Sequence, residues 1–481
     1  MAKSGNRVDE RRAAALAHLN ESAANDDARW THEGSQHFGD GARNAHESHS
    51  VERFRLGNGL KLLLLIDSSA PVLSYFTWFN VGSRHEKPGK TGLAHLFEHL
   101  MFNETEGLKA GEFDRKLEEN GAESNAATWV DWTYYYESLP KDRLALAIQL
   151  ESERMAHLVL REPQVKSELD VVANERRYRV DDDVEGSANE LLYKTAFTCH
   201  PYHWPTIGWM EDIQAFTPAD CEAFYRTYYA PNNATVVIVG DVRELDVLTK
   251  VRDAYGPMPA SVLAPEDTQP EPPQESERLL EIKKPTATEK LMIGYHGPAL
   301  GDADHATLSV LNEVLFGGRA SRMYRALLID QELVTDLRGW VSTFRDPGLY
   351  EMYASARADK TTGEIQAVLE RELARVKDEI VGEDELSRAK ARLELGTLQS
   401  LDTTSGKAEQ IGFYETMLGD PAAAFRRLEA FRRVTTSDLR RVARRYIVDR
   451  ARTIIRVLPE AAADAADAPP AASSTPEEAA Q

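Results

Sequence analysis

Two stretches of sequence 218 positions apart decide the fold. Residues 217–239 read TPADCEAFYRTYYAPNNATVVIV, and residues 435–458 read TTSDLRRVARRYIVDRARTIIRVL. Each opens with a threonine followed three positions later by an aspartate, which is typical of a capping box at the start of a helix. Each closes with an apolar run that predicts a strand. The match indicates two copies of one unit. The alternative is a chance likeness between two amphipathic helices.

Strand patterns open both halves of the chain. In the first half they cover Phe54–Ile66, with Asn58-Gly59 as a hairpin turn, and Leu73–Val81. In the second half they cover Leu279–Ile282 and Lys290–Tyr295. Longer helical patterns follow in both. We therefore expect an α+β fold of two homologous domains, each a mostly antiparallel sheet covered by helices, like one half of a clamshell.

Composition divides the chain into five segments. Residues 51–262 form the expected N-terminal domain and residues 279–459 the C-terminal domain, joined by an acidic, proline-rich linker at 263–278. Residues 1–50 are rich in polar and small residues and predict a disordered arm, although part of it is compatible with a short helix. Residues 460–481 consist mainly of alanine, proline and acids, and predict a disordered tail.

Charge and cysteine content exclude several classes of function. The chain has 57 basic and 78 acidic side chains, a net charge of -21, which disfavours nucleic acid as a partner. Its two cysteines are too few for a disulfide framework or a four-thiolate zinc site.

No run of the sequence reaches the roughly 18 apolar residues of a membrane span. The first fifty residues lack the apolar core of a signal peptide. We expect a cytoplasmic protein without membrane contact, unless a misassigned start codon conceals a leader.

Residues 92–102, GLAHLFEHLMF, contain the residues that point to chemistry. On a helix, His95, Glu98 and His99 share one face. Two imidazoles one turn apart can hold one divalent ion, and the carboxylate between them can take a proton from a water that the ion acidifies. The alternative is a pair of surface histidines beside an acid. A catalytic zinc site also needs a third protein ligand.

A second segment offers that third ligand. Residues 163–179, PQVKSELDVVANERRYR, begin with a proline suited to a helix's first turn. Glu168 and Glu175 lie seven residues apart, so their carboxylates share a face, and an oxygen from a glutamate would complete the ligand shell. The alternative is that both are solvated or paired with the arginines that follow.

These motifs resemble the pitrilysin or insulinase family of zinc metallopeptidases, in the short two-domain form similar to mitochondrial processing peptidase subunits. The family's H-x-x-E-H motif is followed by a glutamate that corresponds to Glu175 here, and the resemblance spans Val51 to Pro459. Further matching motifs are GAESNAAT at 121–128, HPYHWPTIG at 200–208 and YAPNN at 229–233.

The resemblance implies a zinc-dependent endopeptidase that acts on peptides or unfolded polypeptide segments. It implies one Zn²⁺ per chain, held by His95, His99 and Glu175. Glu98 would be the general base on the zinc-bound water, and Glu168 a supporting acid.

The family's active-site edge strand is matched around residues 121–135. The resemblance implies that an extended peptide substrate lies beside Asn125 and Ala126, within the motif that ends at Thr128, and bonds to the strand's backbone. The alternative is an ordinary strand with a buried tyrosine.

The second half lacks the metal motif. Laying residues 309–316 on 94–101 puts Val310 and Val314 where the histidines stand, and only Glu313 remains. The second half is therefore expected to be a wall or lid and not a second active site.

Active members of the family that contain two homologous halves also carry two functional residues in the second half. These are an arginine and, seven residues later, a tyrosine. Here those places hold Leu328 and Thr335, unless the alignment is shifted and Arg319, Arg322 or Tyr324 substitutes. We therefore expect the metal-bearing subunit of a heterodimer whose homologous partner supplies the arginine and tyrosine, with a homodimer as the competing arrangement. The alternative function is a non-catalytic structural or assembly subunit of the same fold.

Overall fold

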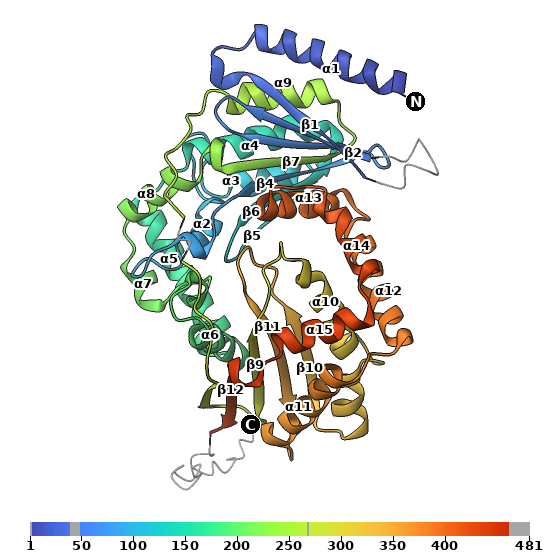
Figure 1. The fold of residues 1–481 in the computed structure, drawn as a ribbon. Helices are drawn as coiled ribbons and strands as arrows, with labels where there is room; N and C mark the ends of the chain where they lie inside the picture. Colours follow the sequence, from blue (N-terminus) through green and yellow to red (C-terminus); the bar gives the residue numbers. More distant parts are fainter. Residues whose placement is uncertain (1, 39–48, 267–268, 461–481) are drawn as a thin grey trace, which may run out of the picture.

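The computed structural model describes residues 2–38, 49–266 and 269–460, so the expected tail at 460–481 lies, apart from Glu460, outside the described residues. Two helix-covered sheets lie one above the other in Figure 1, with the first half of the chain at the top.

The first half is built on a seven-stranded sheet in the order β1-β2-β3-β7-β4-β6-β5. Only β3 and β7 pair in parallel among these strands, so the expected mostly antiparallel sheet is confirmed. A large apolar core lies between the sheet and its helices. The strands are β1 (Trp30–Phe38), β2 (His49–Leu56), β3 (Lys61–Ile66), β4 (Val72–Phe79), β5 (Glu123–Thr128), β6 (Thr133–Pro140) and β7 (Ala234–Gly240). The helices that contribute to that core include α2 (Leu93–Leu100), α4 (Leu144–His157), α5 (Glu162–Arg176), α7 (Met210–Ala215), α8 (Pro218–Tyr228) and α9 (Glu244–Tyr255), and α3 (Glu112–Glu119) packs at its edge.

The second half repeats this pairing. Its five strands run in the order β8-β12-β9-β11-β10, which matches β3-β7-β4-β6-β5 strand for strand, including one parallel pair. Both predicted capping boxes are present, at Thr217 with Asp220 and at Thr435 with Asp438. The duplication predicted from the sequence is therefore visible in the topology. The strands are β8 (Arg278–Lys284), β9 (Lys290–His296), β10 (Val334–Val341), β11 (Leu349–Ala356) and β12 (Arg452–Pro459), and the helices are α10 (Ala303–Phe316), α11 (Thr362–Asp378), α12 (Glu383–Ser400), α14 (Ala423–Arg433) and α15 (Thr436–Tyr446).

The expectation of a disordered arm at residues 1–50 is wrong for its described part. Helix α1 (Ala2–Glu21) and strand β1 are ordered, and β1 extends the first sheet by pairing with β2. Leu16, Leu19 and Trp30 are buried in the first core, and the Trp30 indole donates to the carbonyl of Leu248 on α9. The segment has too few apolar residues for a core of its own, but it orders itself by docking onto one that already exists.

The two halves exchange one helix each. Helix α6 (Val184–Ala196), from the first half, packs Ala188 and Leu192 against the second sheet. Helix α13 (Thr404–Leu418), from the second half, packs Ala408 and Ile411 against the first sheet (Figure 1). The described parts of the connector, 263–266 and 269–277, contain neither helix nor strand. The halves are thus held together by two cores as well as by the connector.

Gly412 gives a direct test of the exchanged helix α13. A methyl group at this position would lie 2.0 Å from Nε1 of Trp78, which is 1% exposed on the first sheet. We expect Gly412→Ala to lower the free energy of unfolding by about 1–3 kcal/mol through overpacking, although alanine favours helices. Urea unfolding would measure it.

The matched control is Gly396→Ala in α12, where an added methyl meets open space. It should stabilise by up to about 1 kcal/mol through helix propensity alone. Equal effects of the two substitutions would contradict the packing described for α13.

Candidate metal centre and substrate edge

Helix α2 starts at a tightly constrained glycine. Gly92 has a φ of 99°, and a Cβ there would lie 2.5 Å from the carbonyl oxygen of Ile207. The buried carboxylate of Glu86 accepts hydrogen bonds from the backbone N–H groups of Gly92 and Ala94, each at 2.7 Å. Burial raises the pKa of Glu86 well above its usual value. Glu86 therefore holds the first turn of the helix that carries both histidines.

Helix α5 faces α2. Val165, Val172 and Ala173 are buried in the first core, which leaves Glu168 and Glu175 together on another face of the helix. Pro163 lies in the first turn, as predicted. The packing of α5 against α2 brings these carboxylates to the histidines.

His95, His99 and Glu175 form one cluster. Their potential ligand atoms all lie within 4.8 Å of one another, and they are the one such group of three found among the described residues. Oε2 of Glu175 is 3.6 Å from Nε2 of His95 and 3.2 Å from Nε2 of His99. Ligands about 2.0–2.1 Å from a tetrahedral zinc ion lie about 3.4 Å apart, so these separations fit zinc. The three residues predicted to bind zinc are thus brought together.

The burial of His95 supports the same fit. His95 is 8% exposed, and its Nε2 is the nitrogen that faces Glu175. Burial lowers the pKa of His95 to about 4, which keeps the imidazole neutral, the form that binds metals. Two imidazoles and a carboxylate are a set of ligands typical of catalytic zinc. Such a site has three protein ligands and leaves a fourth coordination position open.

Carboxylates surround His99. Burial by itself lowers the pKa of His99, but contact with Glu175 and the nearby charges of Glu98 and Glu168 raise it overall. The contact with His99 lowers the pKa of Glu175 in turn. Oε2 of Glu168 lies 3.7 Å from Nδ1 of His99, so Glu168 stands on the side of the ring away from the cluster. From there it can orient the imidazole.

Glu98 lies on α2 beside the cluster. It is partly buried, and burial raises its pKa, while the neighbouring Thr128 and His99 oppose that shift. A carboxyl group whose pKa moves towards neutrality is better suited to accept and return a proton. Thr128, which the family resemblance places in the edge strand, is the last residue of β5 and lies next to the Glu98 carboxylate.

Strand β5 is the outer strand of the first sheet. Among the described residues it pairs only with β6, so its other edge is unpaired. Asn125 is exposed, and its Oδ1 accepts a hydrogen bond from the backbone N–H of Ala126 at 2.9 Å. A polar side chain here covers a donor that an incoming strand would otherwise use. The edge strand predicted from the sequence is present.

The second half offers no equivalent metal site among its described residues. Val310 and Val314 of α10 are buried in the second core, and Glu313 pairs with Arg392 at 2.9 Å. Leu328 packs against that core, and Thr335 donates to the carbonyl of Ser355. Arg322, a possible substitute, is bound by both oxygens of Glu385 at 2.8 Å.

Glu86 is the site residue that sequence reasoning missed. It follows no motif with a known chemical role, and the one available signal was an acid six positions before the glycine that opens the helix.

Within the described ranges, no helix is long and apolar enough to cross a membrane.

Comparison with known proteins identifies two family models along the chain. Residues 63–208 match the model described as insulinase, peptidase family M16, and residues 215–393 match the peptidase M16 inactive domain. The zinc protease PqqE of Helicobacter pylori is 30% identical over 416 residues, which cover 85% of this chain and 93% of that protein. The uncharacterized zinc protease YmxG of Bacillus subtilis is 25% identical over 371 residues, covering 77% and 89%.

The fold has a close counterpart among solved structures. The crystal structure of a protease from Helicobacter pylori superposes with a TM-score of 0.82 at 30% identity, covering 85% of this chain and 99% of that one.

Proposed function

This chain belongs to the insulinase family of peptidases, family M16, and from that premise we propose that it is a zinc-dependent endopeptidase acting on peptides or unfolded polypeptide segments. The observation that carries the proposal is the cluster of His95, His99 and Glu175, with Glu98 on the same helix as both histidines.

The chain's own residues have distinct tasks in this proposal. Zinc, when bound, supplies a Lewis acid that acidifies water and polarises a carbonyl group. Glu98 accepts the proton of the attacking water and returns it to the leaving amine. Glu168 orients His99 from its far side. Glu86 keeps the first turn of α2 in place, so the histidines keep their spacing.

The unpaired edge of β5 supports an extended substrate. A peptide that pairs there displaces the Asn125 side chain from the N–H of Ala126 and bonds to the strand's backbone. An unfolded segment has free backbone N–H and C=O groups along its length, whereas most backbone groups of a folded domain are already paired. The unpaired edge of β5 therefore supports peptides and unfolded segments as the substrate class.

We also propose that the chain works as the metal-bearing subunit of a dimer. The positions of Leu328 and Thr335 provide neither a guanidinium nor a phenol, and Arg322 is engaged by Glu385. A homologous partner would supply an arginine and a tyrosine to stabilise the developing oxyanion. A homodimer is the competing arrangement.

The test is cleavage of a quenched, unstructured peptide by the purified chain, with and without the uncharged chelator 1,10-phenanthroline. We expect chelation to abolish cleavage and added zinc to restore it, because a chelator can remove a zinc ion that is held by only three protein ligands. Activity by the chain alone would contradict the need for a different partner. A zinc-loaded chain that stays inactive alone and with every homologous subunit of its source would instead support a non-catalytic assembly subunit.

A further inference from the structure

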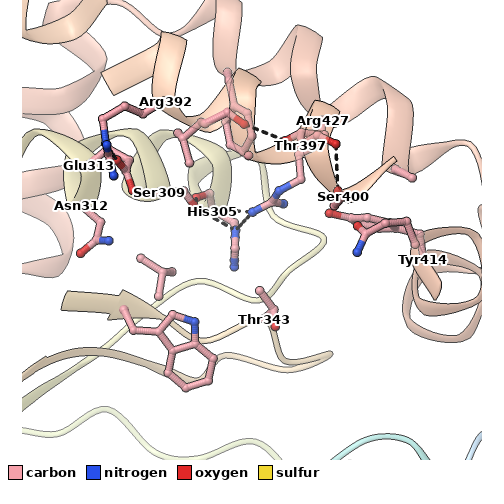
Figure 2. A pocket seen from close by; sticks show the side chains of 17 residues that line it. His305, Ser309, Asn312, Glu313, Thr343, Arg392, Thr397, Ser400, Tyr414 and Arg427 are labelled. Atoms are coloured by element: carbon pink, nitrogen blue, oxygen red, sulfur yellow. Dashed lines mark hydrogen bonds and ion pairs between the residues drawn. The ribbon is translucent and has the colours of Figure 1, made fainter. Parts of the chain in front are cut away.

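A polar cavity of the second half lies between α10, β10, α12, α13 and α14 (Figure 2). Its volume is about 490 Å³, within the range of ligand pockets. Because α10 and β10 are the counterparts of α2 and β5, the cavity occupies the place in the second half where the first half has its metal cluster. The duplicated cleft has thus persisted without metal ligands.

Arg427 points into this cavity with an uncompensated charge. Its Nη2 donates to Nδ1 of His305 at 2.9 Å and lies 3.4 Å from the hydroxyl of Ser309. No carboxylate of the described residues forms an ion pair with it. The lining contains a second arginine, Arg392, and one acidic residue among the described residues, Glu313. These two form an ion pair with each other.

His305 fixes the guanidinium without neutralising it. It is 1% exposed, and its Nε2 donates to the carbonyl of Ser342 at 3.0 Å, so Nδ1 is free to accept from Arg427. Burial and the charge of Arg427 lower the pKa of His305 to about 3. The cavity therefore carries one net positive charge, on a protein whose net charge is -21.

The remaining lining favours an organic anion over an inorganic one. Trp340, Tyr414 and Phe431 give the cavity aromatic walls, and the Phe431 ring lies 5.1 Å from the Arg427 guanidinium. Gly396 of α12 also lines it, and a Cβ there would meet nothing within 4 Å. A glycine inside a helix weakens the helix, and this one is an exposed residue at the edge of the cavity.

We infer that this cavity is a binding site for a singly charged carboxylate attached to an apolar group, held by the Arg427 guanidinium. A planar guanidinium pairs with a carboxylate through two parallel hydrogen bonds, and its single charge matches. The carboxylate is either the C-terminus of a peptide or a small free acid. Neither the zinc ion nor peptidase activity is required for this binding.

The probes are matched pairs that differ only in charge. N-acetylphenylalanine and its amide represent a small acid, and a hexapeptide ending in phenylalanine is used with a free or an amidated C-terminus. Calorimetry is done on the full chain in 1,10-phenanthroline, an uncharged chelator, so that no probe binds to metal and no peptide is cleaved. We expect each acid to bind at least about tenfold more tightly than its amide.

Two variants locate the site, and one serves as control. Arg427→Gln should weaken acid binding at least about tenfold, and Gly396→Phe should weaken it at least as much by placing a ring at the exposed edge of the cavity. Arg433→Gln, at the exposed end of the same helix, should bind like the wild type. If Arg427→Gln fails to fold, Gly396→Phe decides, because its added ring enters open space.

The outcomes separate the sources. Tighter binding of the hexapeptide acid identifies a peptide terminus, and equal or tighter binding of N-acetylphenylalanine identifies a small acid. Equal affinity for acid and amide, no binding at millimolar probe, or wild-type binding by the Gly396→Phe variant would overturn the inference.

Discussion

Replacing Glu98 by glutamine is expected to lower the rate of peptide cleavage by about 10²–10⁴-fold while the chain keeps its zinc, because the amide cannot accept a proton. Glutamine has nearly the same shape, and Glu98 is not among the three residues whose ligand atoms cluster. The measurement is initial rate on a quenched peptide beside zinc content by atomic absorption, under the conditions in which the wild type is active.

The matched control is Glu118→Gln, an exposed acid on the neighbouring helix α3. It should leave both rate and zinc content unchanged. Loss of zinc from the Glu98 variant would reassign Glu98 as a ligand, and unchanged cleavage would remove it from the mechanism.

Removing one imidazole should release the metal. We expect His99→Ala to lower zinc affinity by more than about 100-fold, since loss of an outer-shell partner alone costs about 10–100-fold. Dialysed protein should contain almost no zinc and should not cleave peptide. Zinc content and competition with a fluorescent chelator measure the effect.

His157→Ala is the control for His99→Ala, because His157 is a half-exposed histidine at the end of α4, paired with Glu106. It should retain the metal. If the His99 variant kept a full equivalent of zinc, the metal would have to lie elsewhere. A variant that loses zinc but unfolds is distinguished by circular dichroism.

Local patterns in the sequence predicted many of the fold's helices, strands and turns. The capping boxes at Thr217 and Thr435 each involve only four residues, so they could be identified without knowledge of the rest. The hairpin at Asn58-Gly59 and the helix after Pro163 are local in the same way. The spacing of His95, Glu98 and His99 placed them on one helix, but the contact with Glu175 depends on two helices packing together.

Features that depend on distant contacts were not predictable from one sequence. The N-terminal segment orders because Trp30 reaches α9, more than 200 positions later. Glu86 matters because its carboxylate meets two backbone N–H groups that only a finished helix presents there. Nothing in residues 404–418 indicates which of the two sheets they cover, because their apolar residues are not gathered on one face of the helix.

The exchange of α6 and α13 couples the halves to the order of synthesis. When the ribosome has finished the first sheet, α6 has no surface to cover. The face of that sheet that α13 covers stays exposed until this helix emerges, some 165 residues after β7 ends. Neither half can mature before nearly the whole chain has been made. Such long-range pairing slows folding and leaves apolar faces open to association meanwhile, so the nascent chain is a natural client for chaperones.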